Sequence, residues 1–224
     1  MTAERVCARI PLSEVLRYAG CHGHDERAEQ MAENSIRSLS SVIRPRMISK
    51  ICRVMQTPNG CLFDNALLIP GNDLSVLLNG CTQAALFACT LSAPTDAFIR
   101  KAELFDLSNA LFLDSCATAA VEVLCDLFEE ELQEQYPDLK RTMRYSPGYG
   151  DVPLSVQEPF LAFLDAPRKI GLCATDSSIL TPRKSVTAII GLSNTTVSHN
   201  KRSCETCNLK DHCQFRQKGD FCGR

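Results

Sequence analysis

An eight-residue segment, 144–151, concentrates side chains that could hold a small zwitterionic ligand; it reads Arg-Tyr-Ser-Pro-Gly-Tyr-Gly-Asp. Arg144 offers a fork-shaped donor that suits a carboxylate, and Tyr149 offers an aromatic face with a hydroxyl at its tip. Gly148 has no Cβ and lets the backbone approach a ligand closely, while Pro147 restricts the backbone just before it. The same composition is also typical of a plain turn between two secondary elements.

Two carboxylates upstream of this segment fall on one side of a predicted helix over residues 108–135. Asp114, Thr118 and Glu122 are each four residues apart, so they stack along the helix. Their neighbours on that side are small, and burying carboxylates there without partners would be costly. The acids therefore either have partners or point to water at the edge of the apolar face.

Cysteines form a second chemical signal at the end of the chain. Of thirteen cysteines, most lie among apolar residues and resemble small core side chains, but four fall within residues 204–224. Clustered thiols without an export signal favour metal binding over disulfides, and both zinc and an iron–sulfur cluster stay open. A tail of redox-labile thiols is the alternative. The predicted metal ligands are Cys204, Cys207, Cys213 and Cys222, with His212 able to replace one of them.

The totals are those of an ordinary globular protein: 224 residues, 45% apolar, 22% charged and a net charge of −2. The charge argues against nucleic acid as a partner, and no apolar run is long enough to span a membrane. The N-terminus lacks the apolar segment of a signal peptide, so we expect a cytoplasmic protein. The expected organisation is a globular domain over 1–195 and a cysteine-rich tail over 196–224.

Helices and strands alternate without a repeating βα order. We therefore expect the α+β class, with a twisted, largely antiparallel sheet flanked by helices. A short helical turn capped by Asn72 or Asp73 should follow the turn signal at 70–73. The other helices are expected at 11–20, 25–41, 95–104, 108–135 and 155–164, and the strands at 47–56, 61–69, 83–91, 139–146, 169–175 and 185–192.

Arg144-x-x-x-Gly148-Tyr149 resembles the R-x-x-x-G-Y motif of the activation domain of cobalamin-dependent methionine synthase. Three other segments resemble that family in the same order. They are the helix portion 110–122, the helix 157–164 and the hairpin 175–191, and the likeness covers residues 83–193 in all.

The resemblance implies the family's fold, its ligand S-adenosylmethionine and its role. That role is recovery from corrinoid oxidation: cob(II)alamin takes up one electron while S-adenosylmethionine donates a methyl group. Methyl transfer of this kind depends mainly on positioning, so no catalytic residue is expected. Arg144 would hold the ligand carboxylate, Tyr149 and the backbone at 146 and 148 would line the pocket, and two acids would face the ligand. The residues carried over are Arg144, Ser146, Gly148, Tyr149, Glu122 and Asp114.

Some family features are missing. Asp176 stands where the family usually has Glu, a polar stretch from Asn194 replaces aromatic residues near the corrinoid, and the sequence has no Asp-x-His-x-x-Gly corrinoid signature. We therefore expect a stand-alone module that acts on cobalamin held by a partner, either a methionine synthase or another corrinoid protein. A separate electron-donor protein, or a cluster in the tail, would deliver the electron.

Two alternatives stay open. One is a non-catalytic S-adenosylmethionine-binding protein or an assembly factor for a corrinoid protein. The other is a small metal-binding interaction module joined to an unrelated globular domain.

Overall fold

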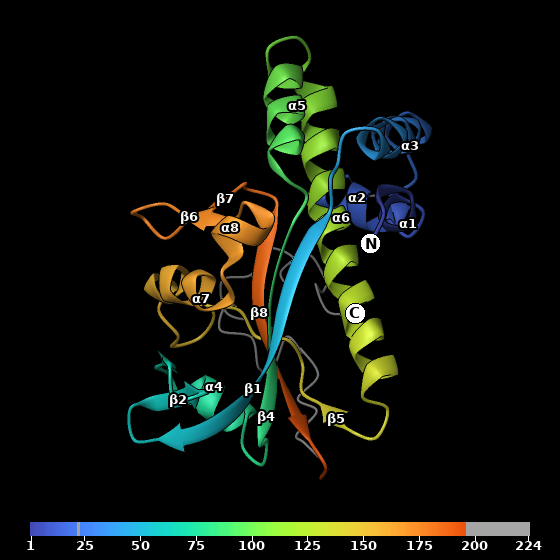
Figure 1. Ribbon diagram of the computed structural model, residues 1–224. Helices are drawn as coiled ribbons and strands as arrows, with labels where there is room; N and C mark the ends of the chain where they lie inside the picture. Colours follow the sequence, from blue (N-terminus) through green and yellow to red (C-terminus); the bar gives the residue numbers. More distant parts are fainter. Residues whose placement is uncertain (22, 196–224) are drawn as a thin grey trace.

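The computed structural model describes residues 1–21 and 23–195, and its centre is a six-stranded sheet (Figure 1). Every strand pairing is antiparallel, which confirms the predicted α+β class. The strand order is β3-β2-β1-β4-β8-β5. The strands are β1 (Arg46–Thr57), β2 (Gly60–Phe63), β3 (Leu67–Ile69), β4 (Gln83–Thr90), β5 (Lys140–Arg141) and β8 (Ser185–Ser193), and a separate ribbon joins β6 (Cys173–Ala174) to β7 (Leu180–Thr181).

Two neighbouring inner strands, β4 and β8, are largely buried. In β4, Phe87 and Cys89 belong to one apolar core, whereas Leu86 and Ala88 belong to the other. This alternation is the period of two of a strand. Because helices cover both faces, β4 is apolar from Ala84 to Cys89, and the predicted buried strand over 83–91 is confirmed.

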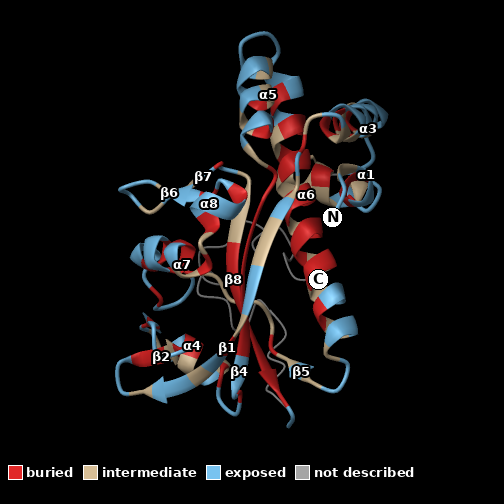
Figure 2. Ribbon diagram, viewed as in Figure 1, coloured by how far each residue is buried: buried red, intermediate tan, exposed pale blue. Residues whose placement is uncertain are grey.

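Five helices pack on the first face: α1 (Ala3–Cys7), α2 (Leu12–Tyr18), α3 (Glu26–Ser40), α5 (Ala93–Glu103) and α6 (Leu107–Gln135). The long helix α6 lies along the sheet with α1, α2 and α3 beside it (Figure 1). Asp106 caps its N-terminus by accepting a hydrogen bond from the amide of Asn109. Figure 2 shows that the sheet-facing side of α6 is largely buried. The predicted helix over 108–135 is therefore confirmed.

The second face carries α4 (Asn72–Leu77), the 3-10 turn η1 (Leu154–Val156), α7 (Gln157–Leu164) and α8 (Ala166–Ile170). The strand predicted over 169–175 is wrong at its start, where α8 lies instead. Pro167 stands in the first turn of α8, a position that suits proline. It therefore begins a helix there.

The strand predicted over 139–146 is also shorter than expected. Only β5 and a single bridge between Tyr145 and Ile189 pair with β8. Between them, the amide of Thr142 donates to the carbonyl oxygen of Gly191, and the amide of Gly191 donates to the hydroxyl of Thr142. The backbone then leaves the sheet at the edge nearest α6. None of the helices in the described part of the chain is both long and apolar enough to cross a bilayer.

Candidate functional site

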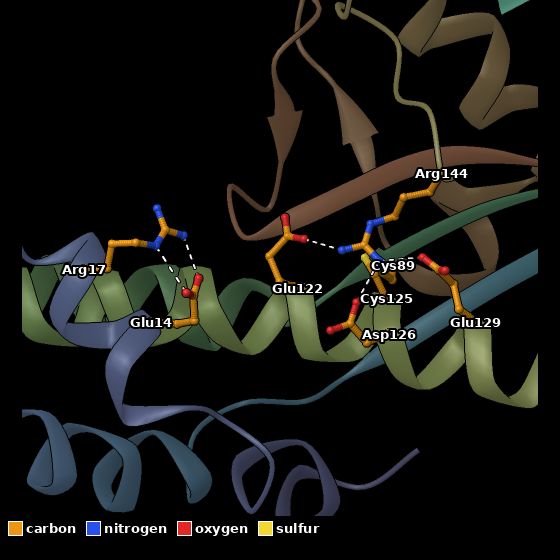
Figure 3. A network of polar contacts seen from close by, with 8 residues as sticks. All are labelled: Glu14, Arg17, Cys89, Glu122, Cys125, Asp126, Glu129 and Arg144. Atoms are coloured by element: carbon orange, nitrogen blue, oxygen red, sulfur yellow. Dashed lines mark hydrogen bonds and ion pairs between the residues drawn. The ribbon is translucent and has the colours of Figure 1, made fainter. Parts of the chain in front are cut away.

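Arg144 leaves the edge of the sheet and ends among three carboxylates of α6 (Figure 3). Its Nη2 donates to Oε2 of Glu122 at 2.6 Å, and its Nη1 donates to Oδ1 of Asp126 at 2.8 Å and to Oε1 of Glu129 at 2.5 Å. The arginine side chain is 14% exposed, whereas each acid is about a quarter to a third exposed. The guanidinium is thus buried and its acids form the rim.

The spacing of the acids explains why they converge. Glu122, Asp126 and Glu129 are four and three residues apart, which places them on one side of a helix. Arg144 faces this side because Thr142, two residues earlier, is buried and fixed to β8. Sequence and topology together therefore bring a basic loop residue against an acidic helix face.

The charges at this site do not balance, because three carboxylates surround one guanidinium. Burial alone would lower the pKa of Arg144, but the nearby Cys125 and the carboxylates raise it above its ordinary value. Cys125 and Cys89 lie next to the arginine in Figure 3, with their sulfurs 3.6 Å apart. Their hydrogen bond and their burial raise the pKa of the Cys125 thiol. The excess of acid suits a ligand that carries positive charge beside a carboxylate.

Asp114 has a different partner further along α6. Nζ of Lys184 is 2.8 Å from Oδ1 of Asp114 and donates to Oγ1 of Thr118 at the same distance. The lysine side chain is 13% exposed, so this pair is also partly buried. Eight residues separate Asp114 from Glu122, which is about 12 Å along a helix. The two predicted acids therefore share one side of α6 but not one cluster.

A small pocket of about 80 Å³ opens beside Asp114. It does not reach Arg144. Its lining comes from α5, α6 and the segment just before β8 and consists of Asp96, Ile99, Arg100, Asp114, Arg183 and Lys184.

The loop that follows Arg144 is held by Tyr145. Its hydroxyl donates to the carbonyl oxygen of Tyr149 at 2.7 Å, and the two rings meet edge to face with centroids 6.4 Å apart. Burial, with Asp73 and Asp151 nearby, raises the pKa of Tyr145 to about 12. Tyr149 itself is 60% exposed. Its ring is therefore available at the surface while its backbone is fixed.

Glycine is required within this loop. Gly148 has φ +91°, a conformation that side chains rarely adopt. Gly150 has φ +53°, and a Cβ there would lie 2.1 Å from Oδ2 of Asp73 and 2.5 Å from the Tyr145 hydroxyl. The loop can therefore approach α4 only because position 150 has no side chain.

Asp151 completes the attachment of the loop to α4. Its carboxylate accepts from the amides of Asn72 at 2.6 Å and Asp73 at 3.1 Å. The expected cap by Asn72 or Asp73 is wrong, because the cap position is Gly71 and the capping oxygens come from Asp151. A cap supplied from 78 residues away leaves no local pattern in the sequence, so sequence reasoning missed it.

Of the predicted ligand residues, the structure brings Arg144 and Glu122 into contact and places Ser146, Gly148 and Tyr149 on the adjoining loop. Their roles toward a ligand stay predictions. Sequence reasoning missed Asp126 and Glu129, although they continue the spacing begun by Glu122. The four predicted metal ligands, Cys204, Cys207, Cys213 and Cys222, lie outside the described residues. Within residues 1–21 and 23–195, no group of three or more potential ligands could hold a metal ion.

Comparison with known proteins supports the fold. No protein-family model matches the chain, and no curated protein matches its sequence. Among solved structures, a crystal structure of the MetH reactivation domain bound to AdoHcy matches with a TM-score of 0.69 and 14% identity. The match covers 98% of this chain and 84% of that one. The chain therefore has the α+β fold of the MetH reactivation domain, with an antiparallel sheet flanked by helices.

Proposed function

We propose that this domain binds S-adenosylmethionine beside Arg144 and serves as a reactivation module for a cobalamin-dependent methionine synthase or another corrinoid protein. The observation that carries the proposal is the contact between Arg144, from the R-x-x-x-G-Y segment, and Glu122 of α6. It occurs in a fold shared with a domain that was crystallised with AdoHcy.

The charges of the ligand fit those of the site. S-adenosylmethionine carries a carboxylate, an ammonium and a sulfonium. Arg144 is suited to the carboxylate, and the excess negative charge of Glu122, Asp126 and Glu129 is suited to the two positive groups. The exposed ring of Tyr149 offers an aromatic face to a cationic or adenine group.

The role proposed for the chain is to hold the ligand in position. A partner's cob(II)alamin, once reduced by one electron, would take the methyl group from bound S-adenosylmethionine, which would leave as S-adenosylhomocysteine. Such a transfer needs an aligned donor and excluded water more than an acid or a base. The residues of the loop 144–151 would supply that alignment because glycine backbone and Asp151 fix their path.

Calorimetry with S-adenosylmethionine tests the binding half of the proposal. Arg144→Gln should weaken binding by about 10-fold to 150-fold, the loss expected for a charged hydrogen bond of about 1.5–3 kcal/mol. Arg168→Gln, a change at an arginine of α8 whose side chain is 76% exposed, is the matched control and should bind normally. Circular dichroism checks that both variants are folded. Unchanged affinity in folded Arg144→Gln would contradict the placement of the ligand.

A reactivation assay tests the other half. The domain is added to a methionine synthase loaded with cob(II)alamin, together with a reductant and S-adenosylmethionine, and recovery of methylcobalamin is followed by its visible spectrum. Recovery that depends on the domain supports the proposal. Tight binding without recovery would favour the alternative, a non-catalytic S-adenosylmethionine-binding protein or an assembly factor for a corrinoid protein.

The cysteine-rich segment over 196–224 is proposed as a metal site that could serve electron delivery. Metal analysis of anaerobically purified full-length protein should find zinc or iron, and Cys207→Ser should lower the content. Protein without either metal, whose Cys207→Ser variant reactivates the partner normally, would remove the tail from the proposal.

A further inference from the structure

The guanidinium of Arg144 is already engaged by carboxylates of its own chain. Nη1 donates hydrogen bonds to Asp126 and Glu129, and Nη2 donates one to Glu122. A ligand carboxylate arriving at this guanidinium would be the fourth. Like charges at such short range repel, and the burial of the arginine weakens screening by water. One of the three acids must therefore withdraw before a ligand carboxylate can bind well.

Glu129 is the acid best placed to withdraw. It shares Nη1 with Asp126, so its departure leaves that nitrogen with a partner. Glu129 also has a longer side chain than Asp126 and therefore a wider reach.

A second cation lies close to Glu129. The guanidinium of Arg141 donates to the backbone carbonyl oxygen of Glu129, which places this cation next to the same helical residue. Arg141 is the last residue of β5 and lies three positions before Arg144. Glu129 thus contacts two arginines: Arg144 bonds to its carboxylate, and Arg141 bonds to its backbone carbonyl oxygen.

We propose that Glu129 is an internal competitor for the carboxylate of the ligand. It occupies Arg144 in the ligand-free domain and turns toward Arg141 when an amino-acid carboxylate binds. The inference rests on the proposed function, because it assumes that the ligand is an adenosyl sulfonium with an amino-acid end. Its consequence is a weaker preference for the carboxylate: Glu129 lowers the advantage that a carboxylate gives to a ligand and so permits ready release.

The test compares S-adenosylmethionine with decarboxylated S-adenosylmethionine, which keeps the sulfonium and the amine but lacks the carboxylate. Calorimetry on the full chain gives both Kd values, and their ratio measures the benefit of the carboxylate. In Glu129→Gln the ratio should shift in favour of S-adenosylmethionine by about fivefold or more, because a neutral amide competes less strongly for a guanidinium than a carboxylate.

The neighbouring residue supplies the control. Glu130 also lies on α6, but it pairs with Arg9 and is 45% exposed, so Glu130→Gln should leave the ratio unchanged. Glu129→Asp provides a second variant, which keeps the charge but shortens the reach and should shift the ratio in the same direction. If the domain binds both ligands and neither change at position 129 moves the ratio, the competitor proposal is wrong and the proposed function stands. If the wild-type chain binds neither ligand, the proposed function itself is overturned, and the competitor with it.

Discussion

Removal of the Asp151 carboxylate should detach the glycine-rich loop from α4. The carboxylate makes two hydrogen bonds, at 2.6 and 3.1 Å, to amides at the start of that helix. Loss of a helix cap costs about 0.5–2 kcal/mol, and the solvent exposure of Asp151 places this case near the middle, at about 1 kcal/mol. For a domain of this size, about 1 kcal/mol lowers Tm by about 2–4 °C. Asp151→Ala should therefore unfold a few degrees below the wild type.

Thermal unfolding followed by circular dichroism measures this directly. Asp151→Asn keeps an acceptor oxygen but loses the charge, so its Tm should fall between those of the wild type and Asp151→Ala. Asp138→Ala removes an exposed acid beyond the end of α6 and serves as the control. The reasoning would be refuted if Asp151→Ala melted with the wild type, or if Asp138→Ala lost as much. Calorimetry should also show weaker S-adenosylmethionine binding by Asp151→Ala, because the loop would lose its fixed path.

Three further changes test other parts of the structure. The Lys184–Asp114 pair should show a coupling energy of about 0.5–3 kcal/mol in a double-mutant cycle of Lys184→Met and Asp114→Asn, measured by urea unfolding; simple additivity would mean that the pair contributes nothing. Tyr145 has its pKa raised from 10 to about 12 in the fold, so its contribution is complete below pH 10 and lost as the pH rises toward 12. Between pH 9 and 12, the free energy of unfolding should therefore fall by up to about 1 kcal/mol more in the wild type than in Tyr145→Phe, a figure reduced for partial exposure. Equal falls in the two proteins would show that Tyr145 does not contribute in this way. Gly191→Ala should cost about 1–3 kcal/mol, because its Cβ would lie 2.7 Å from Sγ of Cys81; an unchanged Tm would show that the neighbours give way freely.

The column of acids on α6 could be predicted because helical spacing is a local property of the sequence. Asp114, Thr118 and Glu122 face the same side in the structure, as their four-residue spacing indicates. Sequence alone could not assign their partners. Lys184 lies just before β8 and Arg144 lies three residues after β5, and the pairing of these two strands brings both residues to that side of the helix.

The wrong strand over 169–175 has an identifiable cause. Apolar alternation over 169–175 favoured a strand. Ile170 and Leu172 are indeed buried, but the first lies at the end of the short helix α8 and the second in the turn after it. Asp165 adopts a left-handed conformation that joins α7 directly to α8. That geometry depends on the packing of both helices against the sheet, so the local pattern did not indicate it.

The sheet divides the apolar interior in two, and the segment from Arg144 to Val152 reaches both halves. Arg144 bonds to the helix that covers one core, while the Val152 side chain is buried in the other. This segment therefore connects the two layers that lie on opposite faces of the sheet. A molecule that clamps it would make the two layers unfold cooperatively, and amide hydrogen exchange would slow on the α7 side as well as the α6 side.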